Sequence, residues 1–460
     1  YIDKNRIYTL TKKINENLHF KFGIKNLYHR MIFTAAALVS ERYGADLNGI
    51  KNRGYEVFRN VIRDTIQKSL EDNKKQNMKL DILMEVYIDI KMNIVENKEA
   101  INDFIDCVIE ISDSVNSDNW NGEDVMGIFF NEFNRYKKKS ESGQVFTPDH
   151  ITSLMYKILE VNANDKILDA ACGSGAFLVK SMSNMIKEVG GINTKEAKKI
   201  KEHSLFGIEF DREIFALACA NMMIHKDGKT NLEQLDSRDK EASEWIKSKG
   251  ITKVLMNPPF ERKYGCKKIV ENVLNSVPSG IKCAFIMPEK KMEKDKMGKL
   301  LEKHHLEAII KLPEKLFDAG VTTSIYVFET GKKQVGEIYG CYIEDDGLER
   351  VKNQGRQDIK DKWMELENYW VDSIRKRNDT KYGTSQWIDP KKFLSYQKPK
   401  AEFVLYEEDF VKTMMNYLMF KNKIDVKEFS DKLINKTLYN SEILKEDNNI
   451  VIKIKDAEDE

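Results

Sequence analysis

The chain has 460 residues, enough for about two or three domains with a large core. Its 75 Lys and Arg residues and 74 Asp and Glu residues leave a formal net charge of +1, whereas a protein that binds nucleic acid alone usually carries a clear basic excess. No apolar run is long enough to span a bilayer, and no signal peptide is recognisable. The six cysteines form no C-x-x-C pair, which argues against a zinc site and a disulfide framework and suits a cytoplasm.

The first part of the chain has the composition of a helical domain. Residues 1–136 are rich in Ile, Leu, Met, Lys and Glu and contain no proline, so we expect an N-terminal helical domain there. One stretch shows the i, i+3, i+4 spacing of a helical face: Leu80, Leu83, Met84, Tyr87 and Ile88. A polar linker follows at 135–143, and its basic cluster at 137–139 is expected to be a solvated loop.

Residues 166–177, KILDAACGSGAF, have the pattern of a strand, a glycine turn and the start of a helix. Gly173 and Gly175 permit a tight turn and let a ligand approach the backbone. The helix that begins at Ala176 turns free N–H groups toward a polar ligand group. The turn is not a P-loop, because no Gly-Lys-Ser/Thr follows, and it lacks the third glycine of the dinucleotide fingerprint.

Residues 203–211 predict a second strand that ends in a carboxylate. An acid at the end of this strand is well placed to bind ribose hydroxyls, and we expect Glu209 to do so. Asp211 is expected to cap the helix that follows. A weaker strand at 231–237 contains Asp236, which either meets the adenine ring of a cofactor or caps a helix.

The tetrapeptide Asn257-Pro258-Pro259-Phe260 follows a short apolar run at 254–256 that predicts a buried strand. Each proline holds φ near about −65° and removes an N–H donor, so this is a stiff bend at the carboxyl end of a strand, where ligands bind in open α/β sheets. The amide oxygen of Asn257 and the carbonyl of Pro258 can accept both N–H bonds of a planar exocyclic amine, and Phe260 can stack on its ring. The alternative is a proline turn that merely ends a strand.

Three later apolar runs, at 283–287, 308–312 and 324–328, complete a sheet that we expect to end near residue 329. The segment 331–400 is charged and contains three of the tryptophans: Trp363, Trp370 and Trp387. This segment either covers the active site or docks a partner, although isolated tryptophans usually anchor a core.

The last part of the chain predicts a helix with one apolar face, formed by Phe410, Met414, Tyr417 and Leu418. The predicted division is a helical domain at 1–136, a sheet domain at 137–400 and a helical tail at 401–460.

Taken in order, the motifs Asp-x-x-Cys-Gly-Ser-Gly, Gly-Ile-Glu-x-Asp, Leu-Asp-Ser and Asn-Pro-Pro-Phe resemble those of the N6-adenine DNA methyltransferases. Within that family, the chain most resembles the modification subunits of type I restriction–modification systems. Two further segments resemble that subgroup, a Thr-Pro segment at 143–151 and a Leu-Pro-Glu segment at 311–325. The resemblance covers about 125–330. One position departs from the family pattern, because Ala170 stands where a proline is usual.

The resemblance implies an α/β fold of the class I, Rossmann-like, S-adenosylmethionine-dependent methyltransferases. It has a seven-stranded mixed sheet with its last strand antiparallel, an N-terminal α-helical domain and a helical C-terminal tail. The implied activity is that of a site-specific adenine-N6 DNA methyltransferase whose target base is flipped out of the duplex. Asn257 and the Pro258 carbonyl would then localise the lone pair of the N6 amine, and positioning would supply most of the rate.

The resemblance also implies roles for individual residues. Asp169 would hold the amino acid end of the cofactor, and Phe146 and Thr147 would wall its methionine side, although Phe146 could equally be a core residue. The catalytic residues implied are Asn257, Pro258, Pro259 and Phe260. The cofactor-binding residues implied are Phe146, Thr147, Pro148, Asp169, Ala171, Cys172, Gly173, Ser174, Gly175, Phe177, Glu209, Asp236 and Asn257.

The implied partners are double-stranded DNA, a separate specificity subunit and, as a further partner, a restriction subunit, in a prokaryotic cytoplasm and without a membrane. The near-neutral charge agrees with a subunit that takes sequence recognition from a partner. A basic cluster directly after the bend is expected either to contact DNA phosphate or to be a solvated loop: Arg262, Lys263, Lys267 and Lys268.

Two other functions remain open at this point. A methyltransferase with the same bend could act on an RNA base or on the amide of a protein glutamine, but the Thr-Pro segment, the helical domain and the Leu-Pro-Glu segment favour DNA. A non-catalytic assembly subunit could keep the fold, but its pocket residues would be free to change. The presence of Asn257, Gly173, Gly175 and Glu209 argues against that alternative.

Overall fold

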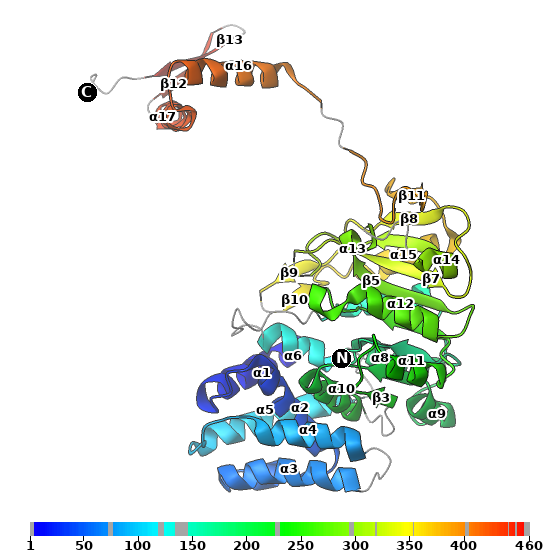
Figure 1. Ribbon diagram of the computed structural model, residues 1–460. Helices are drawn as coiled ribbons and strands as arrows, with labels where there is room; N and C mark the ends of the chain where they lie inside the picture. The colour runs from blue at the N-terminus through cyan, green and yellow to red at the C-terminus, as the bar shows by residue number, and fades with distance from the viewer. Residues whose placement is uncertain are drawn as a thin grey trace. The chain divides into compact units, whose positions relative to one another are not determined.

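The structure is a computed structural model and is drawn in Figure 1. It describes residues 4–71, 77–117, 124–133, 146–225, 231–293, 299–317, 320–352, 354–400, 404–439, 441–446 and 449–454. The chain forms two compact units, Tyr1–Gln397 and Lys398–Glu460. The predicted linker at 135–143 and its basic cluster lie outside the described residues, and the predicted division into three domains stays a prediction.

The N-terminal part is helical, as predicted. Its helices are α1 (Lys4–Glu16), α2 (Leu27–Arg42), α3 (Tyr55–Glu71), α4 (Asn77–Asp89), α5 (Lys98–Asn116) and α6 (Val125–Phe133), with short turns of helix at Asn17–Lys21 and Asn48–Ile50. Helix α2 packs against α3, α4, α5 and α6, which is why its apolar residues are buried along almost its whole length. Four phenylalanine rings fill the centre with centroids 5.5 to 6.1 Å apart: Phe22, Phe33, Phe58 and Phe104.

The predicted apolar face of α4 is partly wrong. Leu83, Met84 and Tyr87 are buried as expected, but 51% of Ile88 is exposed. The side chain of Leu80 lies outside the described part of the chain. The i, i+3, i+4 spacing defines a stripe about 100° wide or more, and the contacts of α4 with α2, α3 and α10 use only part of that stripe.

The central sheet has nine strands in the order β11-β8-β6-β7-β5-β4-β1-β2-β3. Their bounds are β1 (Ile167–Asp169), β2 (Leu205–Ile208), β3 (Asn231–Glu233), β4 (Lys253–Met256), β5 (Lys282–Pro288), β6 (His305–Lys311), β7 (Thr323–Glu329), β8 (Ile338–Tyr342) and β11 (Ser385–Ile388). Strand β7 runs antiparallel to β5 and β6, and β11 runs antiparallel to β8. The first seven strands have the mixed arrangement that was predicted, which confirms the fold class.

The predicted strand count of seven is corrected to nine. The segment 331–400 was treated as one charged region, but it contains the apolar run Ile338–Tyr342, all of which is buried. This run adds β8 beside β6, and β11 then adds a further strand at the edge. A backbone that would be left unpaired at the edge of β6 is thereby hydrogen-bonded.

Helices cover both faces of the sheet (Figure 1). They are α7 (Asp149–Ile158), α8 (Ala176–Glu188), α9 (Lys195–His203), α10 (Arg212–Ile224), α11 (Lys240–Lys247), α12 (Cys266–Ser276), α13 (Glu289–Glu293), α14 (Leu300–Lys303) and α15 (Trp363–Lys376), with a short turn at Arg262–Tyr264. One apolar core joins α7, α8, α10 and α15 to the N-terminal helices, and a second core lies under α11 and α12. The N-terminal helices therefore share a core with one face of the sheet.

The tryptophans of 331–400 divide into two kinds. Trp363 and Trp370 on α15 are buried core anchors, whereas 54% of Trp387 on β11 is exposed. A small hairpin formed by β9 (Glu349–Val351) and β10 (Gly355–Gln357) lies between β8 and α15 in the chain.

The second unit contains α16 (Glu407–Lys421), α17 (Val426–Tyr439) and a hairpin of β12 (Ser441–Glu446) and β13 (Asn449–Ile454). The predicted apolar helix is α16, but its apolar side chains lie on more than one side, and none of its residues is buried. Among the helices that the structure describes, none is long and apolar enough to cross a membrane.

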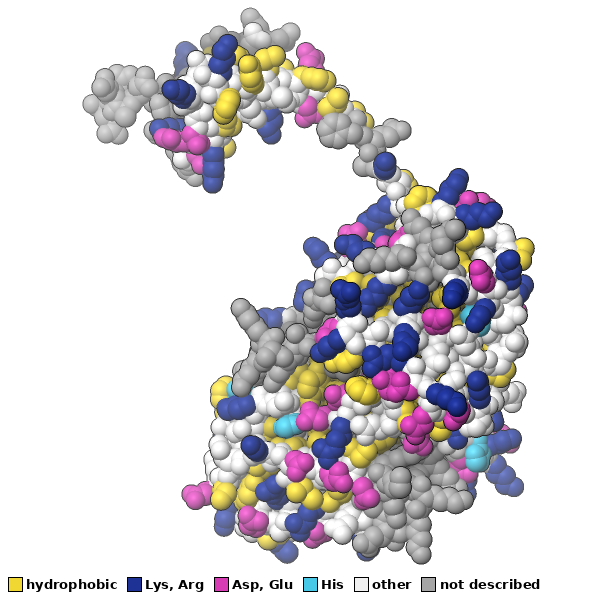
Figure 2. Space-filling view, viewed as in Figure 1, with side chains coloured by type: hydrophobic (Ala, Val, Ile, Leu, Met, Phe, Trp, Pro, Cys, Tyr) yellow, Lys and Arg dark blue, Asp and Glu magenta, His cyan; other side chains and the backbone are white. Residues whose placement is uncertain are grey.

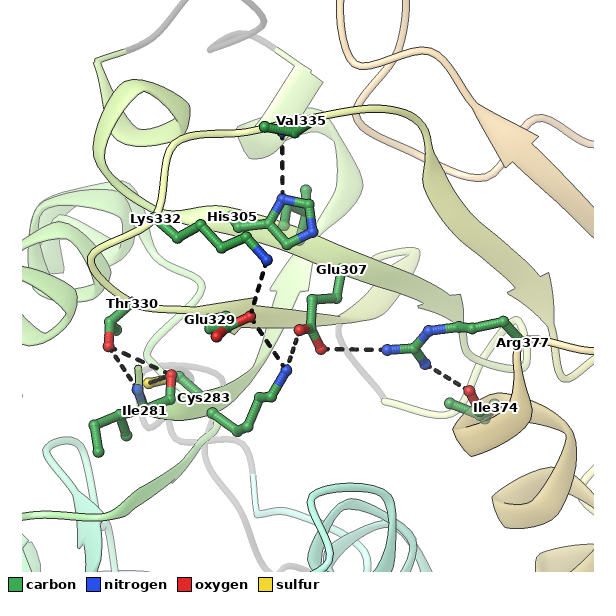
Figure 3. Close-up of polar contacts among 12 residues, drawn as sticks. Ile281, Cys283, His305, Glu307, Glu329, Thr330, Lys332, Val335, Ile374 and Arg377 are labelled. Carbon is green, nitrogen blue, oxygen red and sulfur yellow. Dashed lines mark hydrogen bonds and ion pairs between the residues drawn. The ribbon is translucent and has the colours of Figure 1, made fainter. Parts of the chain in front are cut away.

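A cluster of charged side chains joins the sheet to α15, and Figure 3 shows it. Lys282 on β5 pairs with Glu307 on β6 and lies 3.5 Å from Glu329 on β7. Arg377, directly after α15, lies 3.3 Å from Glu307 (Figure 3). The β6–β7 register shifts between Leu306 and Ala308, so Glu307 is the extra residue of a β-bulge, a device that re-aims a side chain.

We predict that Glu307→Gln lowers the free energy of unfolding by about 1 kcal/mol, because it removes the carboxylate that both Lys282 and Arg377 face. The expected loss of unfolding free energy is small because Lys282 and Arg377 are partly exposed, and solvent weakens their attraction to Glu307. Urea unfolding followed by circular dichroism measures the change, which should shrink at high salt. Glu302→Gln, at an exposed position on α14, is the matched control, and an equal loss in both variants would contradict the prediction.

Candidate active site

Three loops that the sequence singled out lie at one edge of the sheet. Strand β1 pairs in parallel with β2 on one side and with β4 on the other, so their carboxyl ends lie together. The glycine turn follows β1, Glu209 follows β2, and Asn257 follows β4. A pocket at this edge is lined by Phe146, Thr147, Asp169, Ala171, Cys172, Gly173, Ser174, Ala176, Phe177, Glu209, Asn257, Pro258, Pro259 and Phe260.

The glycine turn has a backbone that glycine favours. Gly173 has φ +55° and Gly175 has φ +95°, both in the left-handed region that L side chains rarely adopt. A Cβ placed on Gly173 would meet nothing within 4 Å, so the backbone there faces open space. Gly175 is the N-cap of α8, and the first turn of this helix begins at the pocket, where Ala176 contributes to the lining.

The glycine turn is also hydrogen-bonded to Asn221, a residue outside the sequence motifs. Asn221, buried on α10, donates from Nδ2 to the carbonyl of Ser174 and to Asp124 Oδ1, both at 2.8 Å. Burial raises the pKa of Asp124 to about 6. No sequence signal near the glycine motif identifies Asn221, because the contact joins segments that are 47 and 97 residues apart.

Two buried carboxylates face the pocket. Asp169 accepts a hydrogen bond from the Ala171 N–H at 3.1 Å, and Glu209 accepts from the N–H groups of Gly173 at 2.9 Å and Asp211 at 3.2 Å. Burial raises the pKa of Glu209 to about 7, and burial together with the nearby Glu209 raises the pKa of Asp169 well above its usual range. These acids would gain stability from a ligand that supplies hydroxyl donors or a positive charge.

Cys172 is buried and lines the pocket together with these acids. Burial, with a further contribution from Asp169 and Glu209, raises the pKa of its thiol well above the usual range. The thiol therefore stays protonated and is a poor nucleophile.

The structure separates the other two acids of this region from the pocket. Asp211 caps α10, as predicted, by accepting the N–H of Ile214 at 2.9 Å. Asp236 pairs with Arg238 at 2.6 Å, which lowers the pKa of its carboxyl, and it is not among the residues that line the pocket. The alternative helix-capping role of Asp236 is wrong, because Asp239 is the N-cap of α11.

Asn257 has one amide atom engaged and one without a partner. Its Nδ2 donates to the hydroxyl oxygen of Thr147 at 3.0 Å. Its Oδ1 is buried and, within the part of the chain that the structure describes, accepts no hydrogen bond. Buried polar atoms without a partner are uncommon in folded proteins. The Asn257 amide oxygen, in a residue that lines the pocket, could therefore accept a hydrogen bond from a bound group.

Two aromatic residues, Phe260 and Phe146, line the pocket together with Asn257. Phe260 lines the pocket and packs edge-on against Phe317, with ring centroids 5.4 Å apart, and its carbonyl accepts a hydrogen bond from Lys291. Phe146 stacks on Phe130 with centroids 4.0 Å apart. Phe146 is thus both a core residue and a wall of the pocket, so the two expectations for it are compatible.

The pocket brings together every predicted catalytic residue and all but three of the predicted cofactor residues. Pro148, Gly175 and Asp236 are the three that do not line it, and the first two are the N-caps of α7 and α8. Ala176 lines the pocket but was not predicted as a site residue. Its position as the first residue of a helix after the glycine turn was the signal that could have identified it.

Basic side chains gather beyond the bend, as Figure 2 shows over α12. Arg262, Lys263 and Lys268 are exposed, and Lys267 is half-buried. Lys263 also lies 3.1 Å from Glu261, so part of this charge is already paired.

Comparison with known proteins agrees with this geometry. Residues 121–279 match the family described as N-6 DNA Methylase. The type II restriction enzyme and methyltransferase RM.BcgI of Heyndrickxia coagulans is 30% identical over 340 residues, which cover 68% of this chain and 51% of that protein. The methylase subunit of the type I restriction enzyme EcoEI of Escherichia coli is 22% identical over 215 residues, 42% of this chain and 43% of that one. The chain thus spans about half the length of these curated relatives.

Solved structures share the fold over a larger part of the chain. One solved structure comes from work on the structural basis of complex assembly and conformational transition of the type I R-M system. It matches with a TM-score of 0.59 at 15% identity, and the match covers 94% of this chain and 98% of that chain. The type I restriction-modification methyltransferase subunit of Streptococcus thermophilus has a TM-score of 0.50 at 14% identity, with 84% and 96% covered. These findings confirm that the chain is similar to the N6-adenine DNA methyltransferases and, within them, to the modification subunits of type I restriction–modification systems.

Proposed function

We propose that this chain transfers a methyl group from S-adenosylmethionine to the N6 amine of adenine in DNA, as the modification subunit of a restriction–modification system with a separate specificity subunit. One observation carries the proposal: Asn257 lines the pocket with its amide nitrogen engaged and its buried amide oxygen unpartnered among the described residues. An unsatisfied buried acceptor costs about 1–3 kcal/mol, and an amine that donates to it offsets that cost.

The pocket fits the cofactor that this activity needs. When bound, S-adenosylmethionine supplies a sulfonium whose methyl group is already activated for transfer. Gly173 leaves open space beside the backbone, and the carboxylate of Glu209 is suited to accept from ribose hydroxyls. Asp169 would hold the cationic amino acid end, since its buried carboxyl is stabilised in the charged form by a nearby positive charge.

The acceptor side supplies hydrogen-bond acceptors and no strong base. The lone pair of the adenine N6 amine is delocalised into the ring, which makes it a poor nucleophile. The amide oxygen of Asn257 and the carbonyl of Pro258 would accept its two N–H bonds and draw the nitrogen toward tetrahedral geometry, which localises the lone pair. Both residues line the pocket, so positioning of the amine supplies most of the rate.

A target base inside a duplex has to leave the stack before it can reach this pocket. Phe260 offers a ring face at the pocket for the extruded base. The exposed Arg262, Lys263 and Lys268 are suited to contact the phosphates of the strand on either side, a contact that depends on salt concentration.

The second unit is suited to hold the specificity subunit. Helices α16 and α17 and the segment between them expose a set of large apolar side chains: Phe410, Val411, Met414, Met415, Tyr417, Leu418, Phe420, Ile424, Phe429, Leu433 and Ile434. Figure 2 shows hydrophobic side chains at the surface of this unit. Apolar exposure on this scale marks a protein–protein interface. A specificity subunit bound there would supply the sequence recognition, and a restriction subunit would join through it. The net charge of +1 lacks the basic excess expected of a chain that recognises DNA alone.

The function is tested by incubating the purified chain with radiolabelled S-adenosylmethionine and unmodified DNA, with and without its specificity subunit, and digesting the product to nucleosides. We expect label in N6-methyladenine, and we expect Asn257→Ala to lower the rate by about a thousandfold while cofactor affinity stays nearly unchanged. Asn164→Ala, on an exposed turn, is the matched control. Label in RNA or protein but not in DNA would overturn the proposal, and an equal loss of cofactor affinity in Asn257→Ala would refute its role on the acceptor.

Cofactor affinity should rise between pH 6 and pH 8. The pKa of Glu209 is raised to about 7, so its carboxyl is mostly protonated at pH 6 and mostly ionised at pH 8, and the ionised form is the stronger acceptor for two hydroxyl donors. Glu209→Gln should weaken binding by about tenfold at pH 8 and flatten this pH dependence. Calorimetric titrations at several pH values check both effects, with the exposed Glu244→Gln as control. A pH dependence that survives in Glu209→Gln would assign the titration to another group, such as Asp169.

Charged substitutions on α16 should separate assembly from chemistry. The double variant Phe410→Glu and Met414→Glu places two carboxylates on the exposed apolar surface and should abolish co-purification with the specificity subunit. Cofactor affinity should not change. The control pair Lys412→Glu and Asn416→Glu adds charge at exposed polar positions of the same helix. Retention of the specificity subunit by the Phe410 and Met414 variant would place the interface elsewhere.

A further inference from the structure

We propose that Thr147 is a positioning residue that anchors the nitrogen end of the Asn257 amide and so presents the amide oxygen to the acceptor amine. The proposal rests on the function proposed above. The sequence motif placed Thr147 beside the cofactor, but its hydroxyl oxygen accepts a hydrogen bond from Asn257 Nδ2 at 3.0 Å. This contact assigns it to the acceptor side of the pocket.

An asparagine amide needs such an anchor. The torsion that turns the amide plane is broad and roughly two-fold, and its oxygen and nitrogen ends have nearly the same shape. With the nitrogen end turned to the amine, two N–H donors would face another donor, and the hydrogen bond would be lost. The contact between Thr147 and Nδ2 leaves Oδ1 of Asn257, buried and without a partner among the described residues, as the end that meets the amine.

A hydroxyl can also donate, so the contact with Thr147 alone would permit the flipped amide. The acceptor amine removes that ambiguity, because only the observed orientation gives Asn257 a bond at both ends. With Thr147 in place the amide is held before the base arrives. Without it, the base has to select one orientation from a mobile group, which slows turnover without affecting the cofactor.

The segment that carries Thr147 is held on both sides. The preceding residue, Phe146, stacks on Phe130 of α6 with centroids 4.0 Å apart. The following residue, Pro148, is the N-cap of α7, and its carbonyl accepts from the N–H groups of Ile151 and Thr152. The Thr147 hydroxyl therefore has little freedom to move away from Asn257.

The first turn of α7 is itself bound to two other parts of the fold. Asp149 lies 3.1 Å from Lys180 on α8, the helix that follows the glycine turn. His150 lies 3.0 Å from the fully buried Asp346, which also pairs with Arg356 on β10. Through α7, the position of Thr147 is set relative to the glycine turn and to the hairpin of β9 and β10.

The test compares two substitutions in the full chain, assayed with its specificity subunit. Thr147→Val keeps the shape of the side chain and removes the hydroxyl, and Thr147→Ser keeps the hydroxyl and removes the methyl group. For Thr147→Val we expect the turnover of methyl transfer to fall by about 10- to 100-fold, while the dissociation constant of S-adenosylmethionine changes less than about twofold. Thr147→Ser should recover most of the lost turnover. Thr9→Val, at an exposed position on α1, is the control for the exchange itself.

Each other result overturns the proposal in a recognisable way. Unchanged turnover in Thr147→Val would show that the amide needs no anchor. A loss that appears as weaker cofactor binding would return Thr147 to the cofactor wall. A loss in Thr147→Ser as large as that in Thr147→Val would contradict the proposal, because the retained hydroxyl would then not sustain turnover. Circular dichroism of the Val variant recognises a misfolded protein, so that a change in cofactor binding is interpreted only for a folded one. If the chain without any substitution transfers no methyl group to DNA, the proposed function is wrong, and this inference is wrong with it.

Discussion

The parallel pairing of β1 with β2 and with β4 is the constraint on which the site depends. Parallel strands that are neighbours in a sheet end at the same edge, so the segments after them are brought within reach of one another. Asp169, Glu209 and Asn257 are 40 and 48 residues apart in sequence, yet all three line one pocket because their strands share this edge. The buried apolar strands supply the stability, and the polar ends supply the chemistry.

The pocket keeps polar groups that the fold does not fully satisfy. Burial leaves Glu209 with a pKa of about 7 and Asp169 with a pKa well above its usual range, and the amide oxygen of Asn257 is buried and unpartnered within the described residues. Such groups cost stability when the site is empty, and a ligand with matching donors offsets that cost. Keeping these groups buried therefore lowers the stability of the empty protein, but it also places them before a ligand binds, which is preorganisation.

The N-terminal helices contribute to the site as well as to the core. Asp124, just before α6, holds Asn221, which in turn holds the Ser174 carbonyl of the glycine turn. Phe130 on α6 stacks on Phe146, next to the threonine that contacts Asn257. The helical region is therefore part of the structure that positions both the glycine turn and the Asn257 amide, and it shares one apolar core with the sheet.

By itself the sequence determined the short-range features: the glycine turn, the Asp211 cap, the stiff Asn-Pro-Pro-Phe bend and the helical N-terminal part. Each follows from local backbone preference or from apolar spacing, which neighbouring residues set. Only the tertiary structure decided that Asp236 stays outside the pocket lining, that β8 and β11 extend the sheet to nine strands, and that Thr147 meets Asn257 across 110 residues of chain. Those outcomes depend on which segments, distant in sequence, pack or hydrogen-bond with one another, and the folding of the whole chain decides that.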